Sequence, residues 1–128
     1  AYTEFGLIPL DSLSTKIGDK LTYSNNGIKV GKGVSRVKVS AQVVFWRSTD
    51  TRQLQFAVLK NGKETHAMCY SNLTTGGGYI TQSIVIASEI IDVMENDILT
   101  LNFASEKAGN FVVICDSTHT KLYVEVVE

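Results

Sequence analysis

The stretch LQFAVLKNG, residues 54–62, has the pattern of a β-strand that runs into a tight turn. Its apolar residues Leu54, Phe56 and Val58 are two positions apart, so a strand collects them on one face and leaves that strand half-buried. Asn61-Gly62 follows directly, and this pair favours a two-residue hairpin turn because both residues tolerate positive φ. The stretch therefore predicts a strand that turns back to pair with the next one.

The same alternation recurs along the chain, and no segment has the spacing of an amphipathic helix with its caps. The other apolar sets are Val37, Val39, Ala41, Val43 and Phe45; Leu99, Leu101 and Phe103; and Leu122, Val124 and Val126. Residues that favour turns separate the strands. They are Asn25-Asn26-Gly27, Gly31-Lys32-Gly33, Gly76-Gly77-Gly78 and Glu95-Asn96-Asp97. Short strands and turns without helices predict an all-β antiparallel sandwich or barrel.

We expect one domain over residues 1–128, because a chain of 128 residues buries about two-thirds of its unfolded surface and needs no disulfide. Two cysteines in such a chain, Cys69 and Cys115, are more often free and buried than bridged, and the sequence leaves their redox state open. Eight to ten strands are predicted. They lie at about 7–10, 19–23, 27–30, 34–46, 53–60, 64–70, 79–87, 97–104, 110–116 and 120–127.

Charge and hydropathy argue against two classes of partner. The formal net charge is -1 and the basic residues are scattered, so there is no electrostatic reason to expect nucleic acid or an anionic membrane as a partner. No apolar stretch approaches the roughly 18 residues that membrane insertion as a helix needs.

Five segments follow one another in an order that resembles a known family. They are GIKVGKGVSRVKVSAQVVF (27–45), LQFAVLKNGKE (54–64), ITQSIVIASEIIDV (80–93), ENDILTLNF (95–103) and KLYVEVV (121–127). The order resembles the jelly roll of tumour necrosis factor and of the globular heads of the first complement component. It is most similar to the trimeric knob domains of bacteriophage fibres and receptor-binding proteins. The resemblance covers residues 19–127, with 1–18 as a leading segment.

The pieces that carry most of the resemblance are Leu59-Lys60-Asn61-Gly62 and Asn96-Asp97-Ile98-Leu99-Thr100-Leu101. Two positions depart from the family pattern. The long central strand opens with Gly33-Val34-Ser35-Arg36, where the family commonly has a glycine-tyrosine pair. The acidic turn has Asn96-Asp97 where the family commonly has glycine-aspartate, and asparagine can adopt the same positive φ.

The resemblance implies an antiparallel jelly-roll sandwich that assembles as a homotrimer, with apolar residues meeting at the threefold axis. An independent observation points the same way, because several strands are apolar on both faces, whereas a lone sandwich needs one apolar face per strand. Residues on the second face need cover from loops or from another subunit. The expected trimer interface consists of Val44, Trp46, Val85 and Val113.

A rigid sandwich carries recognition on its loops. The loops expected at 47–53, 71–79 and 104–110 would present Arg47, Arg52, Asn72, Tyr79, Lys107 and Asn110 to a ligand. Together with these loops, the resemblance implies a non-enzymatic structural and adhesive knob on the virion surface or in another extracellular setting. It would trimerise a phage fibre or appendage and bind a cell-surface glycan or protein receptor for host attachment. Whether the knob adheres or only caps and registers the fibre stays open.

Two alternatives also stay open. One is a secreted cytokine-like or complement-like trimeric ligand for a protein receptor. The other is a monomeric carbohydrate-binding module with an exposed aromatic platform; Trp46, Tyr70, Tyr79 and Asn72 are side chains that could bind a sugar.

No residue set predicts catalysis, a cofactor or a metal. There is no G-x-S-x-G elbow and no recognisable triad, so the chain is not expected to be an enzyme. His66-x-x-Cys69 and Cys115-x-x-x-His119 resemble zinc ligands, but residues three apart in a strand face opposite sides. The acidic residues Glu89, Asp92, Glu95, Asp97 and Glu106 straddle a turn and are expected to be solvated, although knobs of this family sometimes hold calcium.

Overall fold

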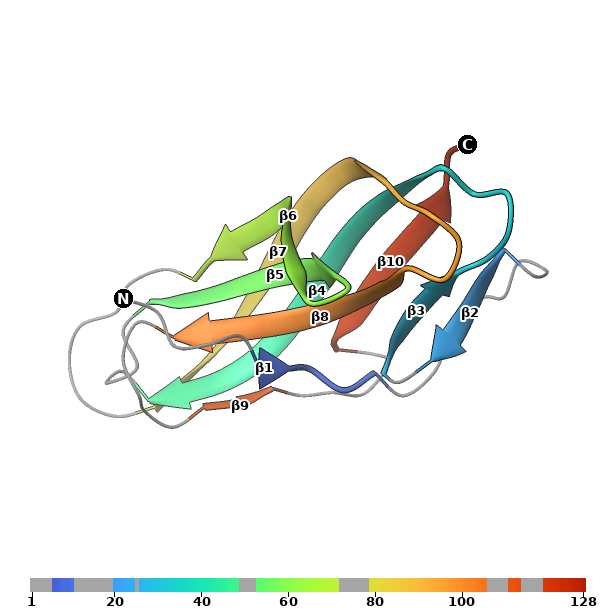
Figure 1. Cartoon of the computed structure of the whole chain (residues 1–128). Coiled ribbons are helices and arrows are strands. Elements are labelled where there is room, and N and C mark those ends of the chain that lie inside the picture. Colours follow the sequence, from blue (N-terminus) through green and yellow to red (C-terminus); the bar gives the residue numbers. More distant parts are fainter. Residues whose placement is uncertain are drawn as a thin grey trace.

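The computed structural model describes residues 6–10, 20–24, 26–48, 53–71, 79–105, 111–113 and 119–128, with the backbone alone at 47–48, 79–80 and 111–113. Over these ranges the chain forms ten strands and no helix, as the sequence predicts (Figure 1). The strands are β1 (Gly6–Leu7), β2 (Leu21–Ser24), β3 (Gly27–Val30), β4 (Arg36–Ser48), β5 (Leu54–Lys60), β6 (Lys63–Tyr70), β7 (Tyr79–Asp92), β8 (Ile98–Ser105), β9 (Phe111–Val113) and β10 (Lys121–Val126).

The strands form two antiparallel sheets. The six-stranded sheet has the order β2-β3-β8-β5-β6, with β1 beside β8. The four-stranded sheet has the order β10-β4-β7, with β9 also beside β4. In Figure 1 the six-stranded sheet lies nearer the viewer, and the four-stranded sheet lies behind it. One cluster of buried residues draws side chains from both sheets, so the architecture is a β-sandwich.

The core depends on the alternation of β4. Its predicted apolar set is buried as expected, with Val37, Val43 and Phe45 each 0% exposed. Across the sandwich, Phe56 of β5 is also 0% exposed, and its ring centroid lies 4.9 Å from that of Phe45. Because this tilted aromatic pair joins the two sheets, it fixes the spacing at the centre of the core.

The β5–β6 hairpin forms as predicted, with Asn61 at φ 53° and Gly62 at φ 79°. β5, however, is buried on both faces, not half-buried. Gln55 is 6% exposed and Ala57 0% exposed, although both lie on the face away from the core. β5 lies between β6 and β8, and longer neighbours such as Met68, opposite Ala57, shield the small residue. Gln55 Nε2 lies 3.7 Å from Met68 Sδ.

The largest difference from the predicted boundaries is in β7, which was expected to end at residue 87 and continues to Asp92. Val39 pairs with Glu89 and Ala41 with Ile86, so three steps along β7 match two along β4. Such a bulge shifts the side-chain alternation by one residue. The pattern of period two therefore stops before the strand does. Several other boundaries differ by one or two residues.

Removing the Phe56 ring from the aromatic pair is expected to destabilise the sandwich strongly. Phe56→Ala should lower the free energy of unfolding by about 3–5 kcal/mol, because it deletes a fully buried ring and leaves a cavity between the sheets. Urea denaturation followed by circular dichroism would measure this. Phe56→Leu keeps most of the volume and should cost clearly less. A loss below about 1 kcal/mol for the alanine variant would contradict this packing.

Candidate functional site

Several large apolar side chains are exposed on the outer face of the four-stranded sheet, meaning the face that points away from the core. Val85 is 68% exposed and Trp46 37% exposed, while Val44 is half-buried. Residues paired across strands share a face, and Val85 pairs with Gln42, between the inward-facing Ala41 and Val43. The three residues therefore share this face, and neighbouring strands do not cover Val85.

The fourth residue expected there is in a different register. Val113 of β9 pairs with Phe45, whose side chain lies in the core, whereas Val112 pairs with Trp46. The pairing therefore groups position 112, not position 113, with the outer face. Sequence alternation within β9 could not reveal this, because the segment Val112-Val113-Ile114 is apolar at every position.

Three further apolar residues of this face were not anticipated as interface residues. Ile90 of β7 is 57% exposed, Tyr123 of β10 is 47% exposed, and Val127 just after β10 is 45% exposed. Ile90 pairs with Lys38, and Tyr123 with Ser40, on the outer side of β4. Ile90 lies beyond the bulge of β7, where the shifted alternation concealed which face it would occupy.

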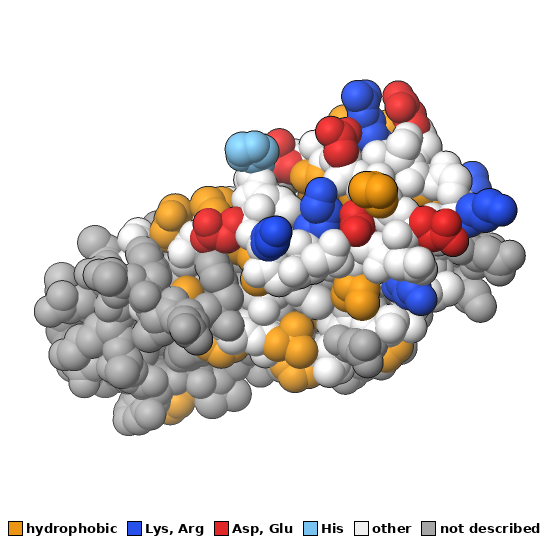
Figure 2. Space-filling model, in the orientation of Figure 1, with side chains coloured by type: hydrophobic (Ala, Val, Ile, Leu, Met, Phe, Trp, Pro, Cys, Tyr) orange, Lys and Arg blue, Asp and Glu red, His pale blue; other side chains and the backbone are white. Residues whose placement is uncertain are grey.

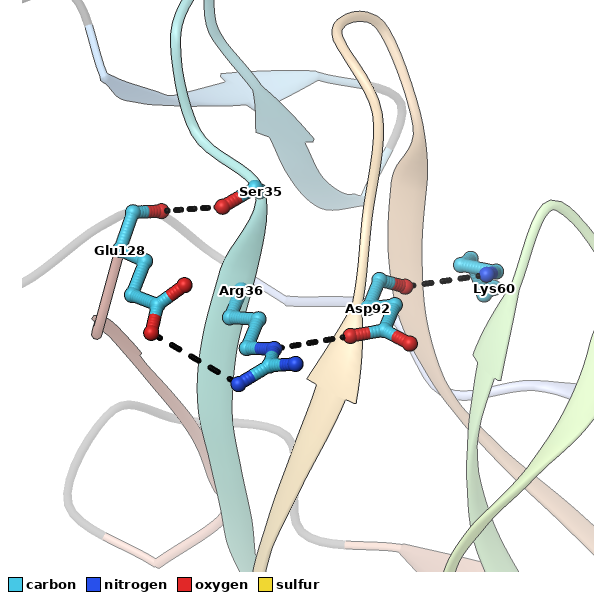
Figure 3. A network of polar contacts seen from close by, with 5 residues as sticks. All are labelled: Ser35, Arg36, Lys60, Asp92 and Glu128. Atoms are coloured by element: carbon cyan, nitrogen blue, oxygen red, sulfur yellow. Dashed lines mark hydrogen bonds and ion pairs between the residues drawn. The ribbon is translucent and has the colours of Figure 1, made fainter.

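Charged residues at one end of the outer face are matched within the chain (Figure 3). Arg36 Nε lies 3.1 Å from Asp92 Oδ1, and Arg36 Nη1 lies 3.6 Å from Glu128 Oε1. Lys38 Nζ is 3.2 Å from Glu125 Oε2. Exposed ion pairs of this kind add little stability. They nevertheless give both Arg36 and Lys38 a carboxylate partner within the same chain.

The opposite side of the molecule differs in character. Figure 2 views it from the six-stranded sheet, and acidic and basic side chains are mixed over much of the described surface. Tyr70, at the end of β6, is 48% exposed, and Leu7 of β1 is 42% exposed. No single sign of charge dominates this view.

A second candidate region is the end of the sandwich from which three long connections leave, called here the loop end. Ser48 at the end of β4 pairs with Tyr79 at the start of β7, and Leu54 at the start of β5 pairs with Ser105 at the end of β8. These strand ends gather on the left of Figure 1. The connections β4–β5, β6–β7 and β8–β9 therefore start from one end of the molecule.

The predicted ligand residues are distributed differently from the expectation. Arg47 and Tyr79 belong to β4 and β7 and not to loops, because these strands extend to residue 48 and begin at residue 79. The pairing of β4 with β7 continues to Ser48 and Tyr79 at the ends of the two strands. The other four lie outside the described residues: Arg52, Asn72, Lys107 and Asn110.

Ser71 fastens the base of the loop end, and sequence analysis gave no sign of this role. It is 2% exposed. The Leu54 amide donates a 2.9 Å hydrogen bond to Ser71 Oγ, and the Ser71 amide donates a 2.8 Å bond to the Leu54 carbonyl. Gln53 Nε2 donates to the Ser71 carbonyl at 3.3 Å. These bonds hold the end of the β4–β5 connection against the start of the β6–β7 connection.

The possible zinc ligands are not brought together. His66 is exposed, whereas Cys69 packs against the core, so the two face opposite sides of β6 as their spacing predicts. Cys115 lies outside the described residues. Within the described part of the chain, no three His, Cys, Asp or Glu side chains are grouped so that they could hold a metal ion.

Two carboxylates of the acidic turn, those of Asp92 and Asp97, already contact other groups of the same chain. Asp92 pairs with Arg36, and Asp97 accepts bonds from the Asn61 side chain at 2.8 Å and from the Met94 amide at 2.8 Å. Glu89 and Glu95 are exposed, as expected of a solvated cluster, and Glu106 lies outside the described residues.

Comparison with known proteins gives no family. No protein-family model matches the chain, and no curated protein matches it in sequence. Among the described residues there is no helix long and apolar enough to cross a membrane.

Cys69 is a free thiol whose reactivity should report its partial burial. Desolvation raises the pKa of Cys69 from 9.0 to about 11. At pH 8 this lowers the thiolate fraction about a hundredfold, and the thiolate is the form that reacts. In a Cys115→Ser background, iodoacetamide should therefore alkylate the native protein about a hundredfold more slowly than the urea-unfolded chain. Equal rates in the two states would contradict the burial of this side chain.

Proposed function

We propose that this chain is a non-enzymatic, homotrimeric adhesive knob with a jelly-roll fold, of the kind carried by phage fibres or similar appendages. The outer face of the four-stranded sheet forms the contact between subunits, and the loop end presents a binding surface to a cell-surface ligand, in the first place carbohydrate. Attachment to a host cell, at the virion surface, is the role that such a module serves.

The path of the chain supports the jelly-roll part of the proposal. The chain passes from one sheet to the other between β3 and β4, β4 and β5, β6 and β7, β7 and β8, and β8 and β9. Among the strands that the structure describes, only the hairpins β2–β3 and β5–β6 pair strands that follow each other directly. Repeated crossing between two antiparallel sheets is typical of Greek-key sandwiches, to which jelly rolls belong.

The single observation that carries the assembly part is the exposure of Val85, Ile90, Tyr123, Val127 and Trp46 on one sheet face. Exposed apolar side chains gathered on one face are a feature of surfaces that pack against another protein. Arg36 and Lys38 already have carboxylate partners in the same chain, so the face offers little net charge for an oppositely charged protein. A second copy of the same chain is the partner that such a face suits.

The arrangement of the two regions links assembly to binding. The outer face runs along the sheet, whereas the three long connections leave from one end of it. In a closed ring of identical subunits, every loop end therefore points the same way along the symmetry axis. Three weak sites presented together bind a surface with far higher avidity than one, which suits attachment to a repeated glycan.

A monomeric carbohydrate-binding module is the second candidate, because Trp46 and Tyr123 are exposed aromatic side chains on the same face. Trp46 and Ser40, the partner of Tyr123, are six positions apart on β4. At a rise of about 3.3 Å per residue the two aromatics are then separated by about 20 Å. One sugar ring could not contact both, so this candidate requires an extended oligosaccharide.

A charge placed at the centre of the outer face should abolish assembly. Sedimentation velocity at micromolar concentration should give a trimer for the unmodified chain and a monomer for Val85→Glu. Burying an unpaired carboxylate costs at least about 3 kcal/mol, which weakens association more than about a hundredfold.

Two matched variants control this experiment. Val85→Thr keeps the branched shape without a charge and should remain assembled, and Leu7→Glu adds the same charge to an apolar residue of the other sheet and should also remain assembled. A monomer for the unmodified chain would refute the trimer, and glycan binding by that monomer would favour the carbohydrate-binding module.

The assembled protein should bind glycans through the loop end. On a glycan array the trimer should give signals that Lys107→Ala or Asn72→Ala reduces severalfold, while Val85→Glu loses them by losing avidity. Trp46→Ala should then act through assembly only. Retention of glycan binding in both loop variants, with loss in a Trp46→Ala protein that remains trimeric, would assign the site to the outer face.

A further inference from the structure

Asn61 is held at both ends of its side-chain amide. Its Nδ2 donates a 2.8 Å hydrogen bond to Asp97 Oδ1, and its Oδ1 accepts a 2.9 Å bond from the Ile98 amide. The Asn61 backbone amide also donates to the Ile98 carbonyl at 2.9 Å. The turn between β5 and β6 is thereby tied to the start of β8, although the two are far apart in sequence.

The residue after Asn61 makes this position chemically vulnerable. In an Asn-Gly pair the backbone nitrogen of glycine can attack the side-chain Cγ of asparagine, because glycine has no side chain to hinder the approach. A Cγ–N bond forms, the Cγ–Nδ2 bond breaks and ammonia leaves, which gives a succinimide. Water then opens the ring to aspartate or isoaspartate. Gly62 offers no steric protection, since open space surrounds the position of a Cβ there.

We propose that Asn61 is a site of spontaneous deamidation and that Asp97 suppresses this reaction in the folded chain. For Gly62 to attack, Cγ of Asn61 must turn toward the glycine nitrogen, and that rotation breaks both side-chain hydrogen bonds. The carboxylate of Asp97, which accepts a 2.8 Å hydrogen bond from the leaving nitrogen, also disfavours the negative charge that develops on Oδ1 of Asn61 when the glycine nitrogen attacks Cγ. The folded chain therefore deamidates at Asn61 much more slowly than the unfolded chain.

Deamidation would destabilise the turns around this position. The new carboxylate would stand where an amide now donates to Asp97, and two carboxylates at this distance repel each other. Asp97 also accepts the 2.8 Å hydrogen bond from the Met94 amide that shapes the β7–β8 turn. Conversion of Asn61 would thus loosen two turns at once, at the end of the sandwich opposite the loop end.

The chain contains a second Asn-Gly pair that is protected differently, which provides an internal reference. Asn26 Oδ1 accepts a 3.0 Å hydrogen bond from the Tyr23 hydroxyl. Here it is the glycine that is confined: Gly27 is buried, pairs with Ser24, and a Cβ on it would lie 2.6 Å from the Leu99 carbonyl oxygen. Asp97 has no part in this site, so its removal should leave Asn26 unaffected.

Peptide mapping by mass spectrometry, with separation of the isoaspartate products, tests the proposal. The protein is incubated at about pH 8 and about 37 °C, both folded and in urea. This temperature lies below the unfolding temperature of a typical domain. Asn61 conversion should be slow in the folded chain and fast in urea. In folded Asp97→Ala it should rise about tenfold or more, the factor for losing one hydrogen bond to a charged group, while Asn26 conversion stays unchanged.

Further variants keep the result decisive. Asp97→Asn keeps an acceptor but loses the charge, and should give an intermediate rate. Thr65→Ala removes the 2.8 Å hydrogen bond to the Val58 carbonyl in the same hairpin and should not change the rate at Asn61. If conversion at Asn61 and Asn26 rises equally in the Asp97 variants, the cause is global opening and the proposal is wrong. Fast Asn61 conversion in the folded unmodified chain would also overturn it.

Discussion

The fold depends on the strict alternation of β4 between a core face and an outer face. Its inner residues from Val37 to Phe45 are buried, and Phe45 meets Phe56 across the sandwich. β4 is hydrogen-bonded to β7 along nearly its whole length and to β10 and β9 on its other edge. Every strand of the four-stranded sheet except β4 itself therefore takes its register from β4. That register decides which apolar side chains are buried and which remain on the surface.

The sequence was sufficient to predict the class of fold because each prediction needed only local information. Period two in β4, β8 and β10 and the Asn61-Gly62 turn are properties of short segments, and the structure contains them. Asn96 at φ 74° likewise adopts the left-handed conformation expected of the residue before Asp97. Errors arose where the outcome depended on a neighbour, such as the bulge of β7 against β4 or the shielding of Ala57 by Met68.

The candidate site was predictable only in part, for the same reason. The second-face positions of Val44, Trp46 and Val85 follow from β4 and from the part of β7 before its bulge, and these residues do share the outer face. Ile90 and Tyr123 complete the face only once the register of three strands is known. No pattern in the sequence distinguishes Ser71 from other polar residues, because its role depends on its distance from Leu54 in space.

The two ends of the sandwich differ in how their connections are held. At one end, short turns are closed by side chains that reach across the fold: Asn61 contacts Asp97, Lys60 Nζ donates to the Asp92 carbonyl at 3.0 Å, and Arg36 joins β4 to Glu128 (Figure 3). At the other end, long connections leave from paired strand ends that Ser71 helps to fasten. Sequence changes in long surface connections cost little stability when their bases are fixed. With the core and the first end fixed, the long connections at the loop end can therefore change in sequence without a change of fold.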